Sequence, residues 1–138
     1  RALMTKKVVL SSIALIIIAF IVMLILLQSK VTKDQIINEF NNNQQTFNAI
    51  IKYAEKSSKN LSIFKSDLKN IDDEDIKKLF KDLNYVGINE NYDKTRITFY
   101  KTIGKQEQGI VYIKDNSKPF GEYELIKSNW YYYIFDHI

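Results

Sequence analysis

Hydrophobic and polar residues are distributed in three different ways along this chain, and each pattern predicts a different kind of element. The first is a continuous apolar run: residues 8–27 read VVLSSIALIIIAFIVMLILL and contain no charged side chain. At about 1.5 Å rise per residue, a helix of this length spans about 30 Å, the thickness of a bilayer's hydrocarbon core. We therefore expect a transmembrane helix over residues 8–27 that contacts the lipid bilayer directly.

The flanks of this run predict an uncleaved anchor and its orientation. Lys6 and Lys7 precede it, and no small-x-small cleavage site follows it. The run is also longer than the roughly 7–15 apolar residues of a signal-peptide core. Basic residues favour the cytoplasmic side, whereas a long domain translocates largely regardless of its charge. We expect a cytoplasmic tail over 1–7, a single-pass anchor over 8–27, a short linker over 28–32 and a domain outside the cytoplasm over 33–138.

The second pattern has the 3.6-residue period of an amphipathic helix. Apolar residues form one stripe between about 33 and 57, and Thr32-Lys33-Asp34-Gln35 resembles a capping box at its start. Five consecutive amides, Asn41 to Gln45, interrupt the stripe. We nevertheless expect one helix over 33–57, and the sequence leaves open whether it is continuous with the transmembrane helix.

A second helix is expected to begin at the acidic run Asp72–Asp75. Carboxylates favour helix N-termini both as caps and against the helix dipole, and the run lacks the glycine and distal glutamate of a calcium loop. Two sets of apolar residues are expected in the core. They are Ile76, Leu79, Phe80 and Leu83 of this helix, and Leu61, Ile63, Phe64 and Leu68 of the segment before it.

The third pattern, from Tyr85 onwards, has the two-residue period of β-strands. Runs of alternating, β-branched or aromatic residues are separated by turn-forming residues. They predict strands at 96–103, 109–114, 123–127 and 130–135, with a further one at 85–89. Helices followed by a run of strands indicate an α+β fold. We expect two helices packed on an antiparallel β-meander of four or five strands, behind the transmembrane helix.

Composition and charge narrow the classes of partner. The formal charge is +4, but residues 28–138 contain 17 basic and 16 acidic side chains, so the predicted domain is nearly neutral. A nucleic-acid binder would carry a basic stripe on the domain itself, and we expect no nucleic-acid partner. The abundant Lys, Ile, Asn and Tyr are encoded by A/T-rich codons, as is typical of an AT-rich bacterial genome.

The inventory of reactive side chains predicts a protein that is not an enzyme and has no cofactor or metal. The chain has no cysteine, and its single histidine is His137. A zinc site needs several His or Cys ligands, and no glycine-rich phosphate loop or glycine-flanked serine is present. A hydrolase using two carboxylates is an alternative. Its acids would come from Glu90, Asp93, Glu107, Glu122 and Glu124.

The order of an apolar helix, an amphipathic helix and an antiparallel sheet resembles a type IV pilin or pseudopilin, which would imply an assembly subunit. Such proteins carry a Gly-Phe processing site and a glutamate five residues into the apolar segment. This chain instead reads Lys7-Val8-Val9-Leu10-Ser11-Ser12 and has neither feature. The helix-then-meander order is also similar to that of cystatin-like binding scaffolds, which is an analogy of fold and not of function.

The C-terminal stretch NWYYYIF, residues 129–135, supplies the candidate binding surface. In a strand, Trp130, Tyr132 and Ile134 share one face, and Tyr131, Tyr133 and Phe135 share the other. We expect the first set to lie in the core under the helices. Tyrosine, tryptophan and arginine dominate interface hot spots. The predicted partner-binding face comprises Tyr131, Tyr133, Tyr100 and Arg96.

These observations favour a membrane-anchored, extracytoplasmic interaction module with a protein partner. Two roles are equally compatible: an accessory subunit of an envelope complex, and an immunity-type protein that blocks a secreted toxin. An immunity protein would bind one partner tightly and protect against that partner alone. The alternatives are a pseudopilin-like assembly subunit and a small carboxylate-dependent hydrolase acting on the cell envelope. The sequence leaves open the partner's identity, the oligomeric state and whether residues 1–3 are native.

Overall fold

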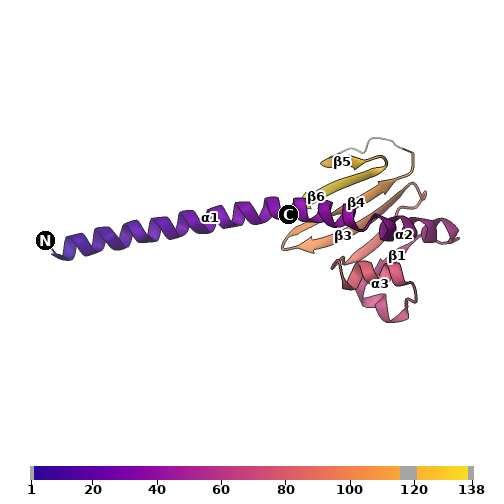
Figure 1. Cartoon of the computed structure of the whole chain (residues 1–138), viewed down its shortest axis with the longest axis horizontal. Helices are drawn as coiled ribbons and strands as arrows, with labels where there is room; N and C mark the ends of the chain where they lie inside the picture. Colours follow the sequence, from indigo (N-terminus) through magenta and orange to yellow (C-terminus); the bar gives the residue numbers. More distant parts are fainter. Residues whose placement is uncertain (1, 116–120, 137–138) are drawn as a thin grey trace. The chain divides into compact units, whose positions relative to one another are not determined.

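The computed structural model describes residues 2–115 and 121–136, and the side chains of 5–26, 32–115 and 121–136 within them. The chain divides into two compact units, Arg1–Gln35 and Ile36–Ile138. Figure 1 labels the elements along the sequence. The helices are α1 (Ala2–Asn42), α2 (Gln44–Lys56), the 3₁₀ helix η1 (Lys65–Asn70) and α3 (Glu74–Lys81). The strands are β1 (Ser62–Phe64), β2 (Gly87–Glu90), β3 (Arg96–Ile103), β4 (Gln106–Ile113), β5 (Tyr123–Lys127) and β6 (Trp130–Asp136).

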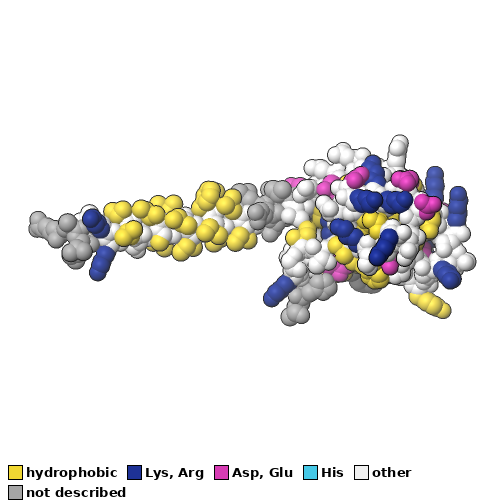
Figure 2. Space-filling model, turned by 90° about the horizontal axis from the view of Figure 1, so that it is seen from below, with side chains coloured by type: hydrophobic (Ala, Val, Ile, Leu, Met, Phe, Trp, Pro, Cys, Tyr) yellow, Lys and Arg dark blue, Asp and Glu magenta, His cyan; other side chains and the backbone are white. Residues whose placement is uncertain are grey.

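The first part of α1 is apolar on all sides. Over Thr5–Leu26 the mean hydropathy is 3.2 and none of this stretch is buried within the protein. Figure 2 shows apolar side chains along the visible side of this helix, with basic side chains near its N-terminal end. Within the described residues, one helix is long and apolar enough to cross a membrane, a property that signal sequences share.

The expected helix over 33–57 is divided differently in the structure. Helix α1 extends to Asn42 and runs through Thr32–Gln35, so no helix begins at the predicted capping box. The chain then breaks at Asn43, whose side-chain amide donates to the Glu39 carbonyl at 2.8 Å. Asparagine side chains compete with the backbone ladder in this way. The amide run therefore ends one helix and starts α2 rather than lying inside a single helix.

All the strands form one antiparallel sheet in the order β1-β2-β3-β4-β6-β5. The α+β class and the antiparallel sheet are confirmed, but the sheet has six strands rather than four or five. It also departs from a simple meander, because β6 returns between β4 and β5. The additional strand is β1, which is only three residues long and lies in the segment 61–68 for which the sequence predicted no secondary structure.

One face of the sheet packs against the helices and forms the main core (Figure 1). Trp130 lies at its centre: its ring centroid is 4.8 Å from Phe40, 6.0 Å from Phe47 and 6.0 Å from Phe99. Phe40 and Phe47 flank the break at Asn43, and their centroids are 5.1 Å apart. The break in the helix therefore leaves the apolar stripe continuous over the sheet.

The acidic run begins α3 as predicted. Asp73 is the N-cap, and its carboxylate accepts a hydrogen bond from the Ile76 amide at 2.9 Å. The apolar residues expected on this helix are all buried: Ile76, Leu79, Phe80 and Leu83. In the preceding segment, Leu61 is buried but Phe64 is 51% exposed. The prediction that Phe64 lies in the core is wrong, because β1 turns that side chain to the sheet face opposite the helices.

Candidate functional site

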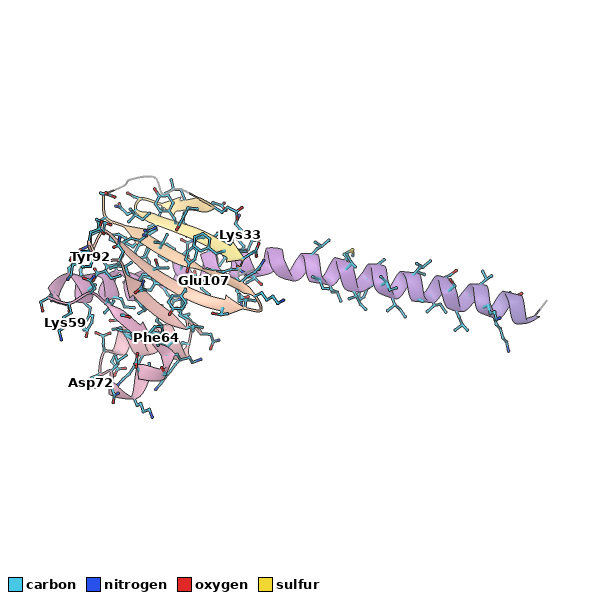
Figure 3. All side chains as sticks on the ribbon, turned by 180° about the vertical axis from the view of Figure 1, so that it is seen from behind. Lys33, Lys59, Phe64, Asp72, Tyr92 and Glu107 are labelled. Carbon is cyan, nitrogen blue, oxygen red and sulfur yellow. The ribbon has the colours of Figure 1, made fainter. Side chains whose placement is uncertain are left out.

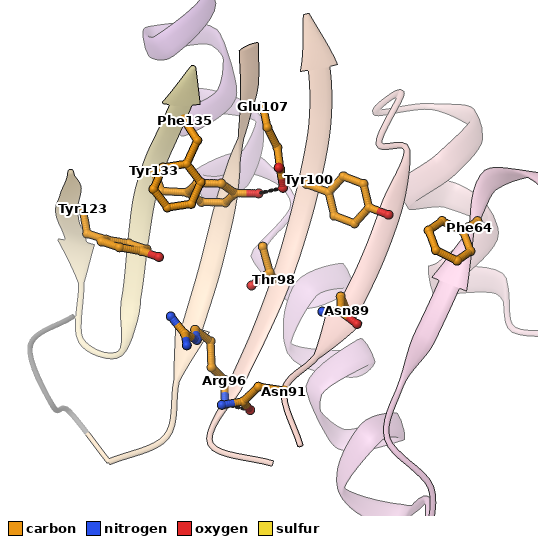
Figure 4. A pocket seen from close by; sticks show the side chains of 10 residues that line it. All are labelled: Phe64, Asn89, Asn91, Arg96, Thr98, Tyr100, Glu107, Tyr123, Tyr133 and Phe135. Carbon is orange, nitrogen blue, oxygen red and sulfur yellow. Dashed lines mark hydrogen bonds between the residues drawn. The ribbon is translucent and has the colours of Figure 1, made fainter. Parts of the chain in front are cut away.

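The sheet face turned away from the helices, which we call the open face, carries the candidate site. In Figure 4 the helices lie behind the strands, and the labelled side chains stand in front of them. A concavity of about 560 Å³ occupies this face. Its lining residues come from every strand of the sheet and from the β2–β3 turn: Phe64, Asn89, Asn91, Arg96, Thr98, Tyr100, Glu107, Tyr123, Tyr133 and Phe135.

The structure brings three of the four predicted site residues together. Arg96, Tyr100 and Tyr133 line the concavity, and Tyr131 lies on the same sheet face without lining it. Trp130 and Tyr132 belong to the core under the helices, with Ile134 partly buried against it. The predicted division of the C-terminal strand between two faces is therefore correct. The expectation that Tyr131 and Tyr133 are exposed is wrong, because Tyr131 is only 8% exposed and Tyr133 only 1%.

Both tyrosines are buried because the open face has an apolar cluster of its own. Tyr131 and Tyr133 pack with Val111 and Ile113, and Tyr100 and Tyr123 lie against them. All six residues belong to strands, whereas the main core also draws on the helices. Large aromatic rings on adjacent strands cover one another, so a side chain can leave the helix side of the sheet without becoming exposed to water.

A row of paired residues across the sheet explains the shape of the concavity. The register joins Phe64 to Gly87, Gly87 to Tyr100, Tyr100 to Gly109, Gly109 to Tyr133, and Tyr133 to Tyr123. Large and absent side chains thus alternate over much of the row. Directly paired positions on one sheet face lie only about 5 Å apart, so each glycine leaves a gap into which a neighbouring ring can lean.

The two glycines of this row are required by space rather than by backbone angle. A Cβ atom on Gly87 would overlap the Tyr100 hydroxyl and ring, which shows that Tyr100 lies over the glycine. A Cβ atom on Gly109 would overlap the backbone carbonyl of Phe99. The first obstacle is the end of a side chain that can move, and the second is backbone that cannot move cheaply. Glycine in a strand often marks such a close approach.

One end of the concavity is aromatic and acidic. Tyr123, Tyr133 and Phe135 form a cluster with ring centroids 5.3 to 6.0 Å apart. The Tyr133 hydroxyl donates to Glu107 at 2.9 Å (Figure 4). Burial, followed by the charge of Glu107, raises the pKa of Tyr133 well above its ordinary value. This phenol therefore stays protonated at neutral pH and holds the carboxylate in place.

The other end of the concavity is basic and is built on a tightly held turn. The Arg96 amide donates to the Asn91 side chain at 2.8 Å, and the Asn91 amide donates to the Arg96 carbonyl at 3.0 Å. The Asn60 side chain donates to the carbonyls of Asn91 and Tyr92 from outside the turn. A hydrogen bond from the Thr95 hydroxyl is the main cause that lowers the pKa of Asp93. These hydrogen bonds fix the backbone from which the Arg96 side chain projects.

Neutral hydrogen-bonding groups lie between the two ends. Asn89 and Thr98 are paired across β2 and β3 on the open face. Within the described part of the chain, their side chains make no hydrogen bond, so their polar atoms are free to meet a bound group. An aromatic floor with a few polar groups at fixed positions is the usual composition of a recognition site.

The concavity contains one carboxylate, Glu107, of the five acids considered for a hydrolase. Glu90 lies on the opposite sheet face and is buried, with one oxygen accepting from the Leu61 amide at 3.0 Å. Asp93, Glu122 and Glu124 are exposed. Among the described residues no group of three or more His, Cys, Asp or Glu side chains is placed to hold a metal ion.

The candidate site predicted from the sequence did not include seven of the ten lining residues. Strand alternation places Phe135 on the face of Tyr133, as predicted, although Phe135 was not included in the candidate site. Alternation also places Thr98 on the face of Tyr100, so that residue could have been found. Phe64 could not, because its strand was not predicted and only the register brings it opposite Gly87. Phe64 on β1 and Glu107 on β4, both labelled in Figure 3, come from segments that are far apart in the sequence.

Comparison with known proteins identifies no relative of this chain. No family model matches it, no curated protein is significantly similar to it, and no solved structure matches its fold at a significant level. The function therefore has to be inferred from the geometry of the chain itself.

Proposed function

We propose that this chain is a membrane-anchored binding module that holds a protein partner on the open face of its sheet. The observation that carries the proposal is the concavity on that face, which combines aromatic side chains with an arginine and free amide and hydroxyl groups. Aromatic residues and arginine are the side chains that contribute most to protein interfaces. The proposal does not assign a catalytic role to any residue.

The apolar patch around the concavity supports a macromolecular partner. Phe64, Phe135 and Leu125 all project from strands on the open face, and are 51%, 43% and 60% exposed. Each costs free energy in contact with water. Phe64 and Phe135 line the concavity and Leu125 lies on the edge strand β5, and exposed apolar side chains on one face are typical of an interaction surface. A partner bound on this patch would bury its apolar area and would cover the apolar cluster of the open face.

The anchor determines where the partner would be met. We propose that the helix over Thr5–Leu26 stays in the membrane, with Lys6 and Lys7 in the cytoplasm and the sheet outside it. A C-terminal alkaline phosphatase fusion should be active in cells, since that enzyme folds only outside the cytoplasm. An inactive fusion with an active cytoplasmic reporter at the same position would contradict this orientation.

The binding proposal is tested by two matched substitutions. Phe135 on the open face and Tyr53 on α2 are nearly equally exposed, at 43% and 44%. The full chain is purified from solubilised membranes of its own host as wild type, Phe135→Asp and Tyr53→Asp. We expect a single stoichiometric protein with the wild type and Tyr53→Asp, and its loss with Phe135→Asp. Loss with both variants or with neither would contradict the open face as the binding surface.

A further inference from the structure

Arg96 stands out among the cations of this domain. The chain has 18 lysines and two arginines, and Arg96 is the one arginine in residues 28–138. Arginine's planar fork binds a carboxylate through two parallel hydrogen bonds, which a lysine cannot do. The domain therefore places this side chain in its concavity and uses lysine at every other cationic position.

The guanidinium of Arg96 is half-buried and has no partner within the described chain. No hydrogen bond or ion pair joins it to a residue of 32–115 or 121–136. Asp93, whose charge interacts with that of Arg96, accepts hydrogen bonds from Thr95. Two other partly buried cations are paired. Lys101 meets Glu39 at 2.9 Å, and Lys94 donates to the Ser57 carbonyl at 2.7 Å. Arg96 thus retains its full capacity for an external anion.

The neighbours of Arg96 favour an anion with a single charge. Asn89, Asn91 and Thr98 are neutral, and Arg96 is the one cation among the lining residues. The other charged lining residue, Glu107, is an acid at the opposite end of the concavity, so no second cation is present to meet a second negative charge. A carboxylate matches one guanidinium in charge and in planar geometry, whereas a phosphate dianion is usually met by several cations or a helix N-terminus.

The length of the concavity favours an extended peptide. Glu107 pairs with Thr102, which is six residues along β3 from Arg96. At about 3.4 Å per residue, the two charged ends are separated by about 20 Å along the strands. An extended chain of about six residues covers that distance. Its apolar side chains would meet the ring of Tyr100 between the two ends, and the rings of Tyr123 and Phe135 at the Glu107 end.

We propose that the partner presents an extended segment to the open face and that a single aspartate or glutamate side chain of this segment binds Arg96. This inference rests on the proposed function and specifies the chemistry of the partner. The second charged residue of the site, Glu107, lies too far along the strands to compete for the same carboxylate.

The test uses the full chain in lipid nanodiscs and a display library of random 12-residue peptides. Peptides are selected on the wild type and counter-selected on Phe135→Asp, so that only binders of the open face remain. We expect an acidic residue at a shared position. Loss of a charged hydrogen-bonded pair costs about 1.5–3 kcal/mol. A selected peptide should therefore bind Arg96→Gln at least about tenfold more weakly. Replacing its acidic residue by the matching amide should weaken wild-type binding equally and change nothing in Arg96→Gln.

Two controls separate charge and fold from recognition. Lys105→Gln removes the same charge from the exposed β3–β4 turn and should leave binding unchanged. Arg96→Lys keeps the charge but not the fork, and should bind with intermediate affinity. The Arg96 backbone bonds to Asn91 do not use its side chain. Circular dichroism of the Arg96 variants should therefore match that of the wild type.

Each other outcome overturns a defined part of the account. Open-face peptides without a shared acid, or with equal affinity for Arg96→Gln, would overturn the role of Arg96 but leave the binding face intact. Absence of any open-face peptide would overturn the peptide proposal, and the co-purification experiment would then decide the binding face separately. Arg96-dependent binding to an array of acidic glycans, without peptide binding, would show that the class of partner is wrong.

Discussion

The two faces of the sheet are made by the same strands but differ in what covers them and in how exposed their side chains are. The helix-side face is closed by α2, α3 and the end of α1, and its residues are almost entirely buried. The open face has an apolar cluster built from strands alone, with polar groups and exposed rings around a concavity. The difference shows how alternation lets one strand place one set of residues in the main core and the other set on the open face.

The largest expected difference between the faces is in stability. Trp130 is 3% exposed and contacts Phe40 at the centre of the main core, so Trp130→Ala should lower the free energy of unfolding by about 3–5 kcal/mol. Phe135→Ala on the open face should cost about 1 kcal/mol, because it loses only part of an aromatic contact. Urea denaturation of the full chain in detergent, followed by circular dichroism, measures both. Equal losses would show that the open face is as much a core as the other.

High pH should destabilise both faces. Burial is the main cause that raises the pKa of Tyr132 to about 12 and raises those of Tyr85 and Tyr133 further. The unfolded chain loses these protons near pH 10 and the folded chain retains them. The stability present below pH 10 is therefore lost as pH rises from 10 toward 12, by up to about 1.4 kcal/mol per pH unit for each tyrosine. Denaturation at pH 8 to 11.5 should show this decline. A flat profile would contradict the burial of these phenols.

The two glycines of the open face should respond differently to a methyl group. Gly109→Ala places its Cβ against the Phe99 carbonyl, which belongs to the backbone, and should cost about 1–3 kcal/mol. Gly87→Ala meets only the end of the Tyr100 side chain, which can swing away, and should cost less than about 1 kcal/mol. Denaturation measures the stabilities. Gly87→Ala should nevertheless weaken partner binding, because it displaces a ring that lines the concavity. Stable Gly109→Ala with unchanged binding in Gly87→Ala would contradict this description of the row.

The smallest effects should come from removing single phenol hydroxyls. Tyr133→Phe loses the hydrogen bond to Glu107 and should cost about 1 kcal/mol. Tyr85 is fully buried and its hydroxyl has no partner within the described chain, so Tyr85→Phe should be neutral or slightly stabilising. Thermal denaturation of the two variants side by side is the measurement. A larger loss for Tyr85→Phe than for Tyr133→Phe would reverse the assignment.

Much of this fold could be predicted from local patterns, because those patterns have local causes. The strands at 96–103 and 123–127 and the start of α3 at the acidic run all follow from period, turn residues and capping. The break at Asn43 could not be placed with the same certainty. Five amides in succession weaken a helix anywhere within them, and the position is decided by one side-chain bond to Glu39.

The candidate site was only partly predictable, because its parts meet through register. Alternation placed Arg96 and Tyr100 on one face of β3 and Tyr133 on the outward face of β6, and the pairing of both strands with β4 brings these faces together. That Tyr133 is buried, and that Phe64 lies opposite Gly87, depends on which strands are neighbours and on the glycines between the rings. Contacts between distant segments have no local signature in the sequence.

The most direct test of the central claim is photo-crosslinking from the two faces in living cells. A p-benzoylphenylalanine at position 135 lies on the open face, and one at position 53 lies on the exposed side of α2. Irradiation should give one discrete adduct from position 135 and none of that size from position 53. The same adduct from both positions, or an adduct from position 53 alone, would contradict a partner bound on the open face.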